Sequence, residues 1–255
     1  MPFIPISDEN DLRLIGFQIV TAVLIAANVL VFLWQLTLDD ESLWSFWYSY
    51  GLIPAVLTGG RELMPSLEKV PAWATIFTSM FLHSSYWHVG GNMLFLWVFG
   101  DNIEDATGHV RFVFFFLLCG IVAGLSEVVV APSSTVPVVG ASGAIAGILG
   151  GYLVLHPRRR LLILVMRTVP IRLNVGLVLV FWILFQIGAA LVVGGDEDNE
   201  TAWWAHVGGF LAGMVLIPLF KRRDIPLFDG QPLAFAMFYR RHDAADNPDE
   251  KDDRP

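Results

Sequence analysis

The sequence is poor in cysteine and in charge. Cys119 is its only cysteine, so a framework of internal disulfide bonds is excluded. This thiol could act as a nucleophile, but its place in an apolar run favours a buried packing role. Only 16% of the 255 residues are charged, 55% are hydrophobic and the mean hydropathy is +0.60, which excludes an ordinary soluble domain. The net charge of −8 gives no support for nucleic acid as a partner.

Long uncharged runs take the place of the missing charge. Residues 14–36 contain no charged side chain, and a helix of this length, at ~1.5 Å per residue, crosses a hydrocarbon core of ~30 Å. The run is too long for a signal-peptide core and the residues before it are acidic, so we interpret it as a retained span. The sequence predicts an all-α polytopic membrane protein, a bundle of six transmembrane helices. The predicted spans are residues 14–36, 87–99, 112–130, 138–155, 173–193 and 202–220.

The expected organisation is a membrane domain at residues 14–220. A polar tail precedes it at residues 1–13, and a second polar tail follows at residues 221–255. The first loop, residues 37–85, is rich in aromatic residues and is expected to lie partly in the membrane interface. The first loop lies on the same side of the membrane as the loops between the third and fourth and between the fifth and sixth spans. Of the 16 lysines and arginines, only Arg61 and Lys69 lie on this side, and the other 14 lie on the side of the two tails. The positive-inside rule therefore predicts that both tails are cytoplasmic and that the acidic loop at 196–200 faces outside.

Four polar side chains within the predicted spans are candidates for function, because an uncompensated polar group in a membrane is costly. They are His88 and Asn92 in the second span, Ser142 near the start of the fourth and His206 near the start of the sixth. All three spans enter from outside, so the four side chains share a depth of roughly 5–10 Å at ~1.5 Å per residue. Prolines precede Ser142, which puts it close to where a loop becomes a helix, about one turn into the span.

This set of side chains suits nucleophilic catalysis. A serine hydroxyl becomes a good nucleophile when a base takes its proton, and histidine is the usual base. Ser142 and His206 would fill these roles, and Asn92, His88 and the Ser142 backbone N–H could bind the negative oxygen of a tetrahedral intermediate. Each residue also has a structural interpretation. Ser142 can be a small packing residue, His206 a connector between helices, and His88 with Asn92 a tie for the first loop.

These residues stand in motifs that resemble the rhomboid family of intramembrane serine proteases, over about residues 75–220. The matching motifs are His88-Val89-Gly90-Gly91-Asn92, Gly100-x-x-x-Glu104-x-x-x-Gly108, Gly140-Ala141-Ser142-Gly143 and Ala205-His206-Val207-Gly208-Gly209. The resemblance implies a Ser142–His206 dyad and an oxyanion site at Asn92, His88 and the Ser142 amide. It implies substrates that are single-span membrane proteins in the lipid bilayer, cut in or near the membrane. The six-span layout with both tails cytoplasmic resembles the simplest bacterial form of the family, so we expect a protein of a bacterial inner (plasma) membrane. We expect no cofactor, no metal ion and no nucleic acid partner.

The chain departs from the family pattern at two places. Some members place an aromatic residue four positions after the serine, where it stacks on the histidine, and here that residue is Ala146. We therefore expect Trp203 or Trp204 to hold the His206 ring. Some members also carry an arginine after the tryptophan of the first loop, which is absent after Trp73.

Further positions carry secondary expectations. Glu104 is predicted to bond loop backbone near the cytoplasmic end of the second span, and His83 to organise a loop. In rhomboids the fifth span is a lateral entry, so Phe181, Trp182 and Phe185 are candidates either for gating bulk or for ordinary lipid contact.

Two other classes of function remain open at this point. A protein of the same fold could bind unstable transmembrane segments without cutting them, and replacement of Ser142 by alanine would separate that from a protease. A transporter would be expected to show an internal repeat, broken helices and charges at the midplane, which the sequence does not favour. A serine protease should also lose activity at low pH, because a protonated His206 cannot accept the serine proton.

Overall fold

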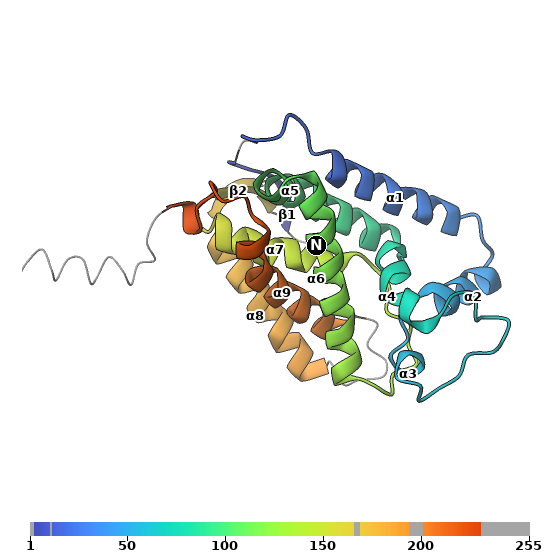
Figure 1. Ribbon diagram of the computed structural model, residues 1–255. Coiled ribbons are helices and arrows are strands. Elements are labelled where there is room, and N and C mark those ends of the chain that lie inside the picture. The colour runs from blue at the N-terminus through green and yellow to red at the C-terminus, as the bar shows by residue number, and fades with distance from the viewer. Residues whose placement is uncertain (1–2, 11, 166–168, 194–200, 231–255) are drawn as a thin grey trace, which may run out of the picture.

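The computed structural model describes residues 3–10, 12–165, 169–193 and 201–230, and helices dominate it (Figure 1). The long helices are α1 (Ile19–Gln35), α5 (Tyr86–Thr107), α6 (His109–Val130), α7 (Ser142–Leu155), α8 (Val175–Val193) and α9 (Trp203–Phe220). The shorter ones are α2 (Asp40–Tyr50), α3 (Pro54–Leu57), α4 (Thr75–Thr78) and the 3-10 turns Ala72–Ala74, Ser79–Phe81 and Phe228–Gly230. The predicted acidic loop at 196–200 and residues 231–255 of the predicted C-terminal tail lie outside the described residues.

A long helix lies in each of the six segments for which the sequence predicts a span. Three of these helices, α6, α8 and α9, are long and apolar enough to cross a membrane. Helices α1 and α7 are apolar but shorter, and α5 is long but carries Asp101, Glu104 and Asp105 in its second half. The described part of the chain is therefore a mostly helical membrane protein with three clear candidate spans.

The fold is mostly helical, but it is not all-α as predicted, because the described residues also form a three-stranded antiparallel sheet. Its order is β1 (Phe3–Asp8), β2 (Arg160–Val165), β3 (Val169–Asn174). The predicted polar tail at 1–13 thus supplies an edge strand, and the loop predicted between the fourth and fifth spans supplies a hairpin. Leu161 and Ile163 of β2 are buried, so the sheet covers apolar surface. Strand β3 runs directly into α8, which begins two residues later than predicted.

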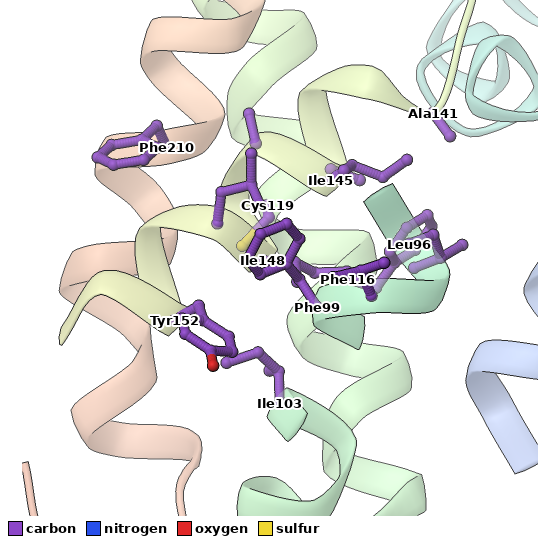
Figure 2. Close-up of a cluster of buried hydrophobic side chains, with 14 of the residues drawn as sticks. Leu96, Phe99, Ile103, Phe116, Cys119, Ala141, Ile145, Ile148, Tyr152 and Phe210 are labelled. Atoms are coloured by element: carbon purple, nitrogen blue, oxygen red, sulfur yellow. The ribbon is translucent and has the colours of Figure 1, made fainter. Parts of the chain in front are cut away.

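Helix α7 is the buried centre of the helical bundle. Its side chains pack between those of α5, α6 and α9 in a cluster that includes Phe99, Ile148 and Tyr152 (Figure 2). Cys119 of α6 is fully buried in the same cluster, in agreement with the packing role predicted for it.

Glycines bring α7 and α9 into backbone contact. A Cβ atom built on Gly213 would lie 1.8 Å from the carbonyl oxygen of Gly147, and one built on Gly209 would lie 2.1 Å from that of Gly143. Only a hydrogen atom fits at either place, as is typical of small residues spaced four apart in packed membrane helices. The contact sets the N-terminal ends of α7 and α9 beside each other, and these ends carry the predicted serine and histidine.

Two carboxylates of α5 fasten the N-terminal segment to the bundle. Glu104 accepts hydrogen bonds from the N–H groups of Val20 and Thr21, at 2.9 and 2.8 Å. Asp105 accepts from the N–H groups of residues 13–15 at 2.7–3.1 Å. Glu104 thus bonds backbone N–H groups, as predicted, but those groups belong to a helix and not to a loop. The carboxylate bonds the first turn of α1, whose N–H groups lack partners within the helix and favour a negative charge.

Candidate active site

Ser142 is the first residue of α7, so it lies where a loop becomes a helix, as predicted, although the predicted fourth span began four residues earlier. The helix starts late because Val138 pairs with Leu52 in an isolated bridge, with N–H···O distances of 2.8 and 3.0 Å. Gly140 follows with a φ of +122°, a conformation that favours glycine and is not helical. Ser142 therefore stands where the unpaired N–H groups of the first turn are exposed to a ligand.

Ser142 and His206 are joined by a hydrogen bond. His206 lies in the first turn of α9, and its Nε2 atom is 2.8 Å from the Oγ atom of Ser142. This is within the distance over which a histidine can act as base toward a serine hydroxyl.

The other ring nitrogen of His206 contacts a residue that the sequence reasoning missed. Its Nδ1 atom is 2.8 Å from Oε1 of Gln186 in α8. The ring also has Trp182 and Trp203 beside it, with centroid distances of 6.1 and 6.3 Å. Trp203 is one of the two residues that we expected to hold the ring, whereas Trp182 was considered for gating bulk or for lipid contact. The signal that could have revealed Gln186 is that it is the one amide in an otherwise apolar helix.

Asn92 lies in the second turn of α5 and is held by His83. The Nδ2 atom of Asn92 is 2.9 Å from Nε2 of His83. Burial lowers the pKa of His83 to about 3, so its ring is neutral and can accept the amide hydrogen. The backbone of His83 is bonded in turn by both ends of the Gln35 side-chain amide, at 2.9 and 3.1 Å. His83 therefore organises its loop, as predicted, and also positions Asn92.

His88 and Asn92 lie against the backbone that leads into Ser142. The Nδ1 atom of His88 is 3.1 Å from Oγ of Ser84. A Cβ atom built on Gly140 would lie 2.6 Å from Nε2 of His88 and 3.6 Å from Nδ2 of Asn92. Two side-chain nitrogens thus lie beside the backbone that leads into α7.

One cavity joins these groups. It has a volume of about 2430 Å³ and is bordered by parts of α5, α7, α8 and α9 and by the segment 131–140. The residues on its wall that bear on the chemistry are His88, Asn92, Ser142, Trp182, Gln186 and His206. The structure therefore brings together all four residues singled out from the sequence and adds Gln186.

Residues 71–223 match the family model described as the Rhomboid domain. The chain belongs to the rhomboid family. Its relatives include "Rhomboid protein 1, mitochondrial" of Saccharomyces cerevisiae, 27% identical over 75% of this chain and 50% of the relative. "Rhomboid protease GluP" of Bacillus subtilis is 31% identical over 63% of this chain and 29% of its own length. The human "Presenilin-associated rhomboid-like protein, mitochondrial" is 29% identical over 78% and 47%. The chain thus spans half or less of the length of these relatives.

Helix α8 has an exposed face that carries phenylalanines and a buried face that carries Gln186. In this rhomboid, Phe181 and Phe185 are 72% and 63% exposed, whereas Gln186 is 5% exposed. Both phenylalanines still border the cavity, and Trp182 lies between it and the bundle. Gating bulk and lipid contact both remain predictions for the two phenylalanines.

Glu127 of α6 is a further polar group on the cavity wall of the rhomboid. Its Oε2 atom accepts a hydrogen bond from the N–H of Ala205 at 3.1 Å, which satisfies one of the free donors in the first turn of α9. Within the described ranges, no group of three or more His, Cys, Asp or Glu side chains is placed to hold a metal ion.

Proposed function

We propose that this rhomboid is an intramembrane serine endopeptidase. It hydrolyses peptide bonds in or near the transmembrane segments of single-span membrane proteins. The observation that supports the proposal most strongly is the 2.8 Å hydrogen bond between Ser142 Oγ and His206 Nε2 on the wall of a large cavity. The relative from Bacillus subtilis is itself named a rhomboid protease.

The proposed reaction is an acyl transfer to Ser142. Its Oγ attacks the carbonyl carbon of the scissile bond while Nε2 of His206 takes the hydroxyl proton. Asn92, His88 and the Ser142 N–H donate to the oxygen that becomes negative in the tetrahedral intermediate. His206 then gives its proton to the leaving amine, and the C–N bond breaks to leave an acyl-serine. Water entering through the cavity is activated by His206 and releases the second product.

The proposed topology has six spans, α1, α5, α6, α7, α8 and α9, within a membrane domain at residues 14–220. The excess of lysine and arginine supports cytoplasmic tails at 1–13 and 221–255, and hence a site that opens to the outside. We place the protein in a bacterial inner membrane, although its relatives include mitochondrial proteins as well as a bacterial one.

Cleavage of a single-span substrate by the purified protein in vesicles tests the function. We expect one main cut near the outer membrane surface, and slower cleavage when helix-breaking residues of the substrate span are replaced by leucine. Product masses identify the bond. Binding of the substrate without any cut would instead support a non-catalytic binder of unstable spans.

Replacement of Asn92 by alanine should lower kcat by about 10²–10³-fold, or ~2.7–4 kcal/mol of transition-state stabilisation, with little change in KM. The reason is that the Asn92 amide meets the oxygen only once negative charge develops. The matched control is Asn28→Ala, because Asn28 is a buried amide on α1 that donates only to its own helix, at Leu24 O. Equal rates in wild type and Asn92→Ala would exclude Asn92 from the oxyanion site.

A further inference from the structure

Gln186 is held in a fixed relation to His206 by the way α8 packs. It is 5% exposed, and its Oε1 atom is 2.8 Å from the imidazole Nδ1. Trp182 lies four residues earlier, so both side chains project from one face of α8, and the Trp182 ring lies beside the His206 ring at 6.1 Å. Ala146, at the position where some rhomboids carry an aromatic residue, offers only a methyl group. Besides Trp203 of α9, the ring is therefore supported by two side chains of α8, Trp182 and Gln186.

We propose that Gln186 is a positioning residue that fixes the tautomer and orientation of His206. This inference rests on the proposed protease function. A carbonyl oxygen can only accept, so Gln186 Oε1 keeps the ring hydrogen on Nδ1 and leaves the lone pair of Nε2 facing the Ser142 hydroxyl. When Nε2 takes the serine proton, the Nδ1–H bond to Gln186 remains in place, so the ring does not turn between the two proton transfers.

The residue at 186 should also influence the charge of His206. Gln186 is neutral and supplies a dipole, whereas a carboxylate in its place would favour the protonated ring. Among the described residues, the titratable groups of the neighbouring helices that border this cavity are His88 of α5 and Glu127 of α6, which bonds the Ala205 N–H. Both are unchanged in variants of Gln186, so a shift in pH dependence between such variants reports residue 186 itself.

The position of Gln186 on α8 gives the bond a further consequence. Helix α8 borders the cavity with Phe181 and Phe185, and Gln186 is the hydrogen-bonding partner that it offers to His206. An outward displacement of α8 would lengthen the Gln186–His206 bond and release the ring. The ability of His206 to act as base therefore depends on the position of α8.

The test measures the rate of fluorophosphonate labelling of the detergent-solubilised full chain as a function of pH. Wild type should lose rate as pH falls, because His206 becomes protonated. Gln186→Met, which keeps the volume but removes the acceptor, should label roughly tenfold more slowly near neutral pH. Gln186→Glu should recover rate at high pH and lose it at a pH about one to three units above that of wild type. Leu184→Met, at an exposed position of α8 that does not border the cavity, is the control and should match wild type.

A second measurement does not depend on activity. Nitrogen NMR of ¹⁵N-histidine-labelled protein should show the hydrogen of His206 on Nδ1 in wild type, and a mixture of tautomers in Gln186→Met. A wild-type hydrogen on Nε2 would overturn the inference. The inference would also be overturned if Gln186→Met and Gln186→Glu lost the same rate and lost it at the same low pH as wild type. That result would mean that residue 186 acts only through packing. Absence of labelling in folded wild type would instead overturn the protease function on which the inference rests.

Discussion

Replacement of Ser142 by alanine is expected to abolish fluorophosphonate labelling and to reduce substrate cleavage by at least about 10⁴-fold. The alanine has no oxygen to attack a phosphonate or a peptide carbonyl. His206→Ala should give a loss of similar size, because the hydroxyl of Ser142 then lacks the base that now lies 2.8 Å away. In-gel fluorescence of the purified variants at equal concentration measures the labelling, and their folding is checked by thermal unfolding.

A second membrane serine separates a specific loss from a general one. Ser126 of α6 bonds the carbonyl oxygen of Val122 in its own helix at 2.8 Å, and it does not border the cavity. Ser126→Ala should therefore label like wild type. Labelling that persists in Ser142→Ala would assign the activated nucleophile to another residue and would remove the basis of the proposed mechanism.

The site could be predicted because its residues are polar and stand in apolar runs of the sequence. A polar side chain in an apolar run is visible without coordinates, and the charge of the loops gives each run a direction. Together these place His88, Asn92, Ser142 and His206 at one depth, and the structure puts them on one cavity. What the sequence does not give is the lateral order of the helices, which the glycine contacts between α7 and α9 decide.

The sheet was missed because its central strand, β2, does not look like a strand in isolation. Strand β2 reads Arg-Leu-Leu-Ile-Leu-Val, a short apolar run without alternation, and its pairing partner β1 lies about 150 residues earlier. Hydropathy likewise could not place the start of α7. Residues 138–141 are apolar enough for a span, but their backbone is used by the bridge to Leu52 and by the positive φ of Gly140. Non-local pairing overrides local preference in both places.

Gln186 shows the limit of counting polar residues. A single glutamine in nineteen residues of α8 leaves the helix apolar enough for a span, so its presence alone carries little weight. Its meaning comes from which residue of α9 lies opposite, and that depends on the rotation of α8 about its own axis. The same rotation turned Trp182, considered from sequence as gating bulk, toward the His206 ring.

Replacement of Gly213 by alanine is expected to destabilise the folded protein by about 3 kcal/mol or more. The new Cβ would lie 1.8 Å from the carbonyl oxygen of Gly147 and 2.5 Å from its carbonyl carbon. Both are backbone atoms inside a helix, so no side-chain rotation relieves the overlap and α7 and α9 must separate. Thermal or denaturant unfolding in detergent measures the loss, and fluorophosphonate labelling of the remaining folded fraction should fall as well.

The fall in labelling follows from the same geometry. Ser142 and His206 stand at the adjoining ends of α7 and α9, so any separation of the two backbones lengthens their hydrogen bond. Gly188→Ala provides the control, because a Cβ at this position of α8 meets nothing within 4 Å and alanine is the better helix former. If Gly213→Ala unfolds at the wild-type temperature, backbone contact between α7 and α9 is not what holds the serine beside its base.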